Sequence, residues 1–130
     1  MLSTVVIIFC LAAEFFGREA ARRFLSYSYS YNTGAAFGLL SDAPAMLLNL
    51  EIAANVIVLL LLVFARMKKW TRIGLSMMFG GALSNLMERF LLGHVIDWLP
   101  VPYTSLQFNL SDVFNGLGAL LVFMALSDRL

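Results

Sequence analysis

The chain has 130 residues, of which 61% are hydrophobic and only 13% are charged, and its formal net charge is +1. A soluble domain carries about twice that charged fraction, so the composition indicates an integral membrane protein. The small net charge argues against a nucleic-acid partner, because phosphate binding requires a clustered basic surface.

Metal-binding side chains are scarce in this sequence. Cys10 is the only cysteine and His94 the only histidine, which excludes an intrachain disulfide and a cysteine-based metal site. His94 fits an interfacial side chain, a hydrogen-bond partner behind a site, or a ligand, but one histidine without cysteine does not make a zinc site. We therefore expect no metal and no cofactor.

The first predicted helix covers residues 2–16. It has neither a charged n-region nor an A-x-A cleavage site, so we interpret it as a retained transmembrane helix. It is short for a span of about 20 residues, and continuation through Gly17 into the amphipathic REAARRFL would lengthen it. Glu14 and Arg18 are four residues apart and are predicted to pair, either as a helix cap or as a brace for a nearby site.

An outer segment is predicted over residues 17–43. Ser and Tyr alternate over residues 26–31, which favours a strand with one aromatic face. The sequence N-T-G-A-A-F-G follows at 32–38, and its small residues permit close backbone approach, although a generic turn explains it equally.

The second predicted helix covers residues 44–65 and is long enough to cross a bilayer. Glu51 and Asn55 share one of its faces, where they fit a functional site or a polar contact inside the bundle. The loop R-M-K-K-W-T-R at 66–72 holds four basic residues, which places it on the cytoplasmic side. With four spans, both termini are then cytoplasmic, and residues 17–43 and 92–109 lie outside.

The third predicted helix covers residues 71–91 and is rich in small residues, which predicts tight helix contacts. Asn85, Glu88 and Arg89 lie on one face near its outer end. The fourth covers residues 110–126 and has Asp112 in its first turn, where an N-cap role for Ser111 or Asp112 is the alternative to a functional role. We find no internal repeat and expect a single domain over residues 1–130.

Asp97 and Asp112 are the two carboxylates that flank this last connection. If the connection folds back over the bundle, the two lie close together and share one proton. One can then take a proton from water while the other donates to a carbonyl oxygen, as in an aspartic peptidase. A proton carrier or a cation site fits the spacing equally well.

Four segments, taken together and in order, resemble bacterial lipoprotein signal peptidase, also called signal peptidase II. N-T-G-A-A-F-G at 32–38 matches that family's N-x-G-A-A-F, and G-G-A-L-S-N-L-M-E-R at 80–89 resembles its G-G-A-x-G-N-L-x-D-R. V-I-D-W at 95–98 resembles V-x-D-F, and F-N-L-S-D at 108–112 resembles F-N-x-A-D. Each segment is weak alone, but their joint occurrence over almost the whole chain is specific.

The resemblance implies an all-α membrane protein with four transmembrane helices, a small extracytoplasmic β-cradle and a capping loop. It implies an aspartyl endopeptidase of the bacterial cytoplasmic membrane that cleaves diacylglyceryl-modified prolipoproteins just before the lipidated cysteine. Asp97 and Asp112 would be the catalytic dyad, and Arg89 would reach toward the substrate backbone. The resemblance, together with the predicted pair in the first helix, suggests a set of supporting residues. They are Asn32, Gly34, Ala35, Asn85, Glu88, Arg89, Asn109, Glu14 and Arg18. The implied partners are the lipidated prolipoprotein, membrane lipid and lipopeptide inhibitors such as globomycin, and a monomer is the expected form.

The chain departs from the family pattern at several positions. Glu88 stands where the family has Asp, E-F-F-G-R at 14–18 stands where it has D-Q-x-[ST]-K, and Ser84 and Ser111 replace Gly and Ala. The outer segments are also short. We interpret the chain as a divergent, active member. The alternatives are a non-catalytic relative that binds lipidated peptides and a small proton- or ion-coupled transporter.

Overall fold

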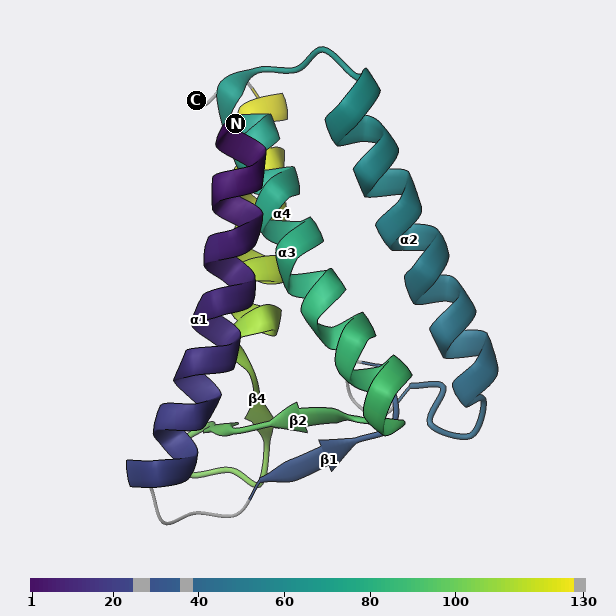
Figure 1. The fold of residues 1–130 in the computed structure, drawn as a ribbon, viewed down its shortest axis with the longest axis vertical. Helices are drawn as coiled ribbons and strands as arrows, with labels where there is room; N and C mark the ends of the chain where they lie inside the picture. Colours follow the sequence, from purple (N-terminus) through teal and green to yellow (C-terminus); the bar gives the residue numbers. More distant parts are fainter. Residues whose placement is uncertain (25–28, 36–38, 128–130) are drawn as a thin grey trace.

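The computed structural model describes residues 1–24, 29–35 and 39–127, and in this part of the chain four helices run along one axis (Figure 1). They are α1 (Leu2–Phe24), α2 (Pro44–Phe64), α3 (Lys69–Leu92) and α4 (Leu110–Leu126). Four short strands lie together at one end: β1 (Ser30–Asn32), β2 (Val95–Asp97), β3 (Leu99–Pro100) and β4 (Gln107–Phe108). The start of α1, the end of α4 and the α2–α3 connection lie at the opposite end.

The first helix is longer than the predicted 2–16, because α1 continues to Phe24. Gly17 does not end it, and the following Ala20 and Ala21 are strong helix formers. The missing side chain at Gly17 instead makes room for another segment, since a Cβ there would lie 2.9 Å from the ring of Trp98. Residues 17–24 therefore belong to the helix and not to an extended outer segment. The bounds of α2 and α3 differ from prediction by one or two residues, and those of α4 agree with it.

Small residues bring α3 against its neighbours, as predicted. A Cβ at Gly74 would lie 2.6 Å from the backbone oxygen of Gly118, and one at Gly81 would lie 2.5 Å from that of Ser111. A Cβ at Gly80 would lie 2.8 Å from the Cβ of Cys10 on α1. The contact at Gly81 brings the strand end of α3 to the first turn of α4. This close approach decides where the polar side chains of both helices meet.

The strands form two small antiparallel pairs. In the first pair, β1 lies beside β2 with Ser30 opposite Asp97 and Asn32 opposite Val95. In the second, β3 lies beside β4 with Leu99 opposite Phe108. The predicted strand at 26–31 is represented by β1, which starts at Ser30. Residues 25–28, and residues 36–38 of the N-T-G-A-A-F-G segment, lie outside the described residues.

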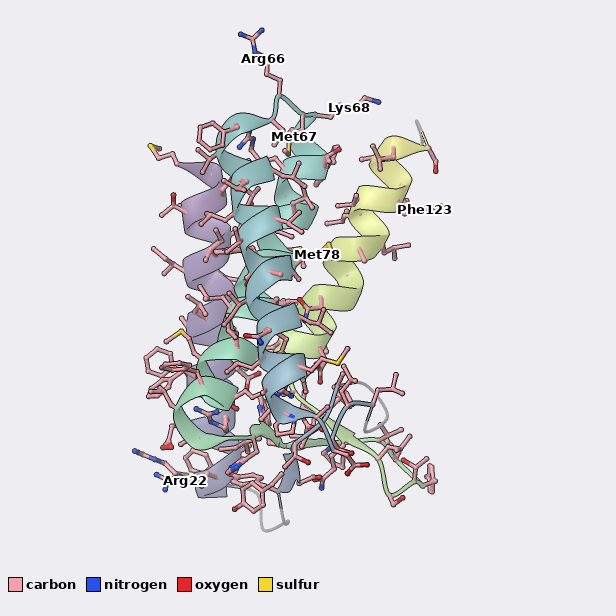
Figure 2. The ribbon with its side chains drawn as sticks, turned by 90° about the vertical axis from the view of Figure 1, so that its right-hand side faces the viewer. Arg22, Arg66, Met67, Lys68, Met78 and Phe123 are labelled. Carbon is pink, nitrogen blue, oxygen red and sulfur yellow. The ribbon has the colours of Figure 1, made fainter. Side chains whose placement is uncertain are left out.

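The outer surface of the helices is strongly apolar. On α2, only Leu47, Asn55 and Leu62 are buried. Among the described helices, α2 alone is both long and apolar enough to cross a membrane, with a mean hydropathy of 2.5, while α4 is apolar but shorter. Figure 2 shows Arg66 and Lys68 at the end away from the strands and Arg22 at the strand end.

Candidate functional site

Asp97 is the last residue of β2, and its carboxylate is held by two asparagines. It is 5% exposed. Its Oδ2 accepts a hydrogen bond from Asn32 Nδ2 at 3.2 Å, and its Oδ1 accepts one from Asn109 Nδ2 at 3.0 Å. Asn32 is brought there by the pairing of β1 with β2, and Asn109 by the end of the β3–β4 hairpin. Three segments distant in sequence therefore meet at one carboxylate.

Asp112 lies in the first turn of α4 and takes part in a capping box. Asn109 is the N-cap residue: its Oδ1 accepts from the backbone N of Asp112 at 2.9 Å, and its backbone N donates to Asp112 Oδ2 at 3.1 Å. The N-cap residue is thus Asn109, so the predicted N-cap role for Ser111 or Asp112 is wrong, and Asp112 takes part as the N3 residue of the capping box. The remaining oxygen, Oδ1, accepts from Asn85 Nδ2 at 3.2 Å, and Asp112 stays exposed.

Asn109 joins the two aspartates through one continuous hydrogen-bond network. Its Nδ2 donates to Asp97 and also to Asn85 Oδ1, the latter at 3.1 Å. Asn85 in turn donates to Asp112. Since Asn109 is 1% exposed, the network is buried at its centre and open at Asp112. Asp97, Asn109, Asn85 and Asp112 are called the aspartate network below.

The environment of Asp97 favours its protonated form. Its pKa is raised from an ordinary 3.8 to about 6, chiefly by burial, then by the negative charge of Asp112 and to a smaller extent by that of Glu14. The hydrogen bonds from Asn32 and Asn109 act in the opposite direction, because they stabilise the carboxylate. Two carboxyl groups with different exposure, one of which keeps its proton up to about pH 6, suit a step that needs both an acid and a base.

The polar residues at the end of α3 point to three different neighbours. Asn85 reaches α4. Glu88 forms an ion pair with Arg18 and accepts from the backbone N of Ile96 at 2.9 Å, so it joins α1 to β2. Arg89, which is 8% exposed, pairs with Glu51 of α2 and donates to the backbone oxygen of Gly34 at 2.8 Å.

The predicted pairing of Glu14 with Arg18 is wrong. Arg18 pairs with Glu88, while Glu14 accepts from Trp98 Nε1 at 2.7 Å and from the backbone N of Ser111 at 3.2 Å. The spacing allowed the intrahelical pair, but α3, β2 and α4 pack against α1 and offer partners on both sides.

A cleft of about 990 Å³ opens beside the aspartate network at the strand end of the molecule. Asp97, Asp112, Asn85 and Arg89 all line it, and Glu88 points away toward α1 and β2. The residues around the cleft come from α2, α3, α4, β1, β2 and β4 and from the connections beside them. They are Ser30, Tyr31, Asn32, Thr33, Gly34, Ala35, Glu51, Asn85, Arg89, Val95, Asp97, Val101, Ser105, Leu106, Gln107, Phe108, Asp112 and Asn115.

Sequence reasoning did not include Glu51, Trp98 or Asn115 among the site residues. Glu51 carried a signal, since an acid in an apolar helix is expected to have a polar partner, but Arg89 lies 38 positions away. Trp98 had the signal of an indole N–H in a buried position, which requires an acceptor. His94 contacts Tyr31 edge-to-face, with 4.8 Å between ring centroids. No group of three or more His, Cys, Asp or Glu residues within 1–24, 29–35 and 39–127 is arranged to hold a metal ion.

Known proteins resemble this chain over most of its length. A family profile described as "Signal peptidase (SPase) II" matches residues 3–127. A lipoprotein signal peptidase of Nostoc punctiforme is 35% identical over 101 residues, covering 76% of this chain and 64% of the relative. One from Ectopseudomonas mendocina is 37% identical over 113 residues, covering 80% and 67%. One from Pseudomonas fluorescens is 31% identical over 140 aligned positions, covering 93% and 82%. The matches to the first two relatives therefore span about two thirds of their lengths.

Two solved structures share the fold. A structure described as "Bacterial membrane enzyme structure by the in meso method at 2.3 A resolution" has a TM-score of 0.77 and 22% identity, covering 97% of this chain and 87% of the other. A second, with the same description at 1.9 Å resolution, has a TM-score of 0.71 and 23% identity, covering 95% and 91%.

Proposed function

Because the chain belongs to the signal peptidase II family, we propose that it is an aspartyl endopeptidase of lipoprotein signal peptides. Its substrate is a prolipoprotein whose cysteine carries diacylglycerol, and it cleaves the peptide bond just before that cysteine. The observation that carries this proposal is the aspartate network, in which Asp97 and Asp112 lie on one cleft with a shared asparagine between them.

The proposed reaction uses the difference between the two carboxyl groups. The exposed Asp112 takes a proton from a water molecule, whose oxygen then attacks the carbonyl carbon of the scissile bond. Asp97 donates its proton to the carbonyl oxygen, which gives a neutral tetrahedral diol. Collapse of the diol breaks the C–N bond. The leaving nitrogen takes a proton from Asp112, and a diol hydroxyl returns a proton to Asp97.

The surroundings of the cleft fit a membrane-embedded substrate. We infer that all four helices cross the bacterial cytoplasmic membrane, with both termini and the basic 66–72 loop inside and the cleft near the outer face. The apolar exterior of α2 supports this arrangement, as do the charged residues near the helix ends. In this arrangement acyl chains on the substrate cysteine remain in lipid while the peptide enters the polar cleft, and globomycin inhibits by occupying that cleft.

The test uses the purified full chain in lipid nanodiscs with a diacylglyceryl-modified prolipoprotein, followed by gel mobility and mass spectrometry. We expect Asp97→Asn and Asp112→Asn each to lower the cleavage rate by at least about 100-fold, since each removes a proton-transfer group. Asp42→Asn is the matched control, because Asp42 is exposed outside the cleft. Unlipidated prolipoprotein tests whether the diacylglyceryl group is required.

Three results would contradict the proposal. Cleavage that survives either substitution would exclude the dyad. Binding of the lipidated peptide by the wild-type protein without any cleavage would identify a non-catalytic relative. Ion flux across the membrane of proteoliposomes that is lost when Asp97 or Asp112 is substituted, again without cleavage, would favour the transporter.

A further inference from the structure

The carboxylate of Glu14 contacts both segments that carry the aspartates of the cleft. Oε1 accepts from the indole Nε1 of Trp98 at 2.7 Å, and Oε2 accepts from the backbone N of Ser111 at 3.2 Å. Trp98 directly follows Asp97 in the chain, and Ser111 directly precedes Asp112. Each oxygen of this one side chain is thus bonded to the immediate neighbour of a different aspartate.

The contact with Trp98 combines a hydrogen bond and close packing. Trp98 is 5% exposed, and its ring lies against α1 where Gly17 follows Glu14 by one turn. A Cβ at Gly17 would lie 2.9 Å from the ring of Trp98 and 3.1 Å from Leu110. The backbone N of Trp98 donates to the backbone oxygen of Phe108 at 2.9 Å. The ring of Trp98 is therefore held by α1, and the backbone of Trp98 is held by β4.

The contact with Ser111 completes the start of α4. The first backbone N–H groups of a helix have no partner within the helix. Asn109 accepts from the N–H of Asp112, and Glu14 accepts from that of Ser111. With Glu14 2% exposed and Ser111 0% exposed, water does not replace this bond easily.

We propose that Glu14 is a positioning residue that sets the separation and orientation of Asp97 and Asp112 by holding Trp98 and the first turn of α4. The proposal rests on the proposed function, since it assigns a role in that reaction. Glu14 does not line the cleft, and its hydrogen bonds reach the two aspartates through Trp98 and Ser111. A carboxylate is suited to this task because its two oxygens accept in two directions, and bonds to a charged acceptor are stronger than neutral ones.

The charge of Glu14 supplies a second, independent readout. The other charged groups around Asp97 are Asp112 of α4, the Arg18–Glu88 pair between α1 and α3, and the Arg89–Glu51 pair between α3 and α2. Burial and Asp112 are the larger causes of the raised pKa of Asp97, and the negative charge of Glu14 raises it further. Neutralising Glu14 must then lower that pKa.

Two substitutions test the positioning role in the full chain in nanodiscs with lipidated prolipoprotein. Glu14→Gln keeps the shape but leaves one acceptor oxygen for two N–H groups. Trp98→Phe keeps an aromatic ring and removes the indole N–H. We expect each to lower kcat by about 10- to 100-fold, the scale of small misplacements of catalytic groups, with KM within about twofold. The controls are Glu19→Gln, on the same helix in a surface pair with Arg22, and Trp70→Phe, at the far end of the molecule.

The pH profile and the double variant separate positioning from a general loss of structure. In Glu14→Gln, the alkaline limb of kcat/KM moves to lower pH, whereas a purely structural defect lowers the rate equally at every pH. The double variant Glu14→Gln/Trp98→Phe is about as slow as the slower single variant, because both changes break the same arrangement. Thermal unfolding of each variant identifies any that does not fold.

The outcomes are distinguishable from failure of the proposed function. Wild-type protein that does not cleave overturns the function itself. Wild-type cleavage with a kcat for folded Trp98→Phe within about twofold of normal overturns the positioning role alone. Losses that multiply in the double variant, or an unmoved alkaline limb in folded Glu14→Gln, also overturn it.

Discussion

At the scale of single residues, the two aspartates differ because of what surrounds them. Asp97 is buried between two asparagine donors, whereas Asp112 is exposed and takes part in the capping box of α4. Glu88 is longer than the aspartate of the family pattern, and its two oxygens reach Arg18 and the backbone of Ile96. Its role in this structure is to join α1 to β2, which carries Asp97.

The raised pKa of Asp97 predicts how activity depends on pH. Below about pH 6 Asp97 keeps the proton that the proposed mechanism donates, and above about pH 6 Asp97 has lost it. We therefore expect kcat/KM to fall tenfold per pH unit above an apparent pKa near 6, because the loss of one essential proton inactivates the enzyme. The pH dependence of kcat/KM is the one to measure, since it reports the groups of the free enzyme. Initial cleavage rates at substrate concentrations below KM measure it. A flat profile between pH 5 and pH 8 would contradict the assignment of Asp97 as the acid.

The same pKa predicts a stability effect with a definite sign. The folded-state pKa of about 6 lies above the ordinary 3.8, so Asp97 favours folding most below pH 3.8 and loses this contribution as pH rises to 6. Asp97→Asn should then stabilise the fold at pH 7.5 by at most about 3 kcal/mol, and by much less at pH 4. Thermal unfolding at both pH values measures the difference. Equal effects at the two values would show that the buried charge is not the cause.

At the scale of elements, the close contact of α3 with α4 brings the cleft residues together. Gly81 lies against the backbone of Ser111, and Asn85 follows Gly81 by one turn, which brings it beside Asp112. The capping box at Asn109 then fixes the direction in which Asp112 points. Neither helix alone places these side chains, because α3 supplies Asn85, α4 supplies Asp112 and β2 supplies Asp97.

Two glycines provide a matched test of this helix contact. Gly81→Ala puts a Cβ 2.5 Å from a backbone oxygen, whereas Gly116→Ala on α4 meets nothing within 4 Å. We expect Gly81→Ala to destabilise the protein by about 1–3 kcal/mol and to slow cleavage, since the helices must separate. Gly116→Ala should leave both unchanged or raise stability slightly. Unfolding and cleavage assays on both variants decide this, and similar behaviour of the two would argue against close contact at Gly81.

At the scale of the whole molecule, the strands lie at one end and the basic loop at the other (Figures 1 and 2). The lining residues place the cleft at the strand end. Such a division fits a protein whose two ends face different compartments. The fully exposed Tyr103, in the β3–β4 connection, marks the strand end. Lys68, which is exposed, marks the other.

The orientation can be measured by cysteine labelling in a Cys10→Ser background. Tyr103→Cys should react with a membrane-impermeant maleimide in intact spheroplasts, because we place it outside. Lys68→Cys should react only after the membrane is opened, because positively charged short loops stay inside. Labelling of both positions from outside, or the reverse pattern, would contradict the proposed topology. Retained cleavage by each variant confirms that it is folded.

The sequence by itself determined what depends on local pattern. Hydrophobic runs located α2, α3 and α4 to within a few residues, since a helix is closed by backbone bonds four residues apart. Ordered motifs identified the family, which the comparisons confirm. The proximity of Asp97 and Asp112 followed once the connection was assumed to fold back.

Only the tertiary structure decided which side chains became partners. Arg18 pairs with Glu88 and not with Glu14, and Arg89 pairs with Glu51, which lies 38 positions earlier in the chain. Glu14 accepts from residues 84 and 97 positions away. No periodicity encodes these pairs, because they arise from how closely glycines let the helices approach and from which buried donors remain without an acceptor. The sequence therefore predicted the two aspartates of the candidate site, but it did not predict the hydrogen bonds and ion pairs that hold them.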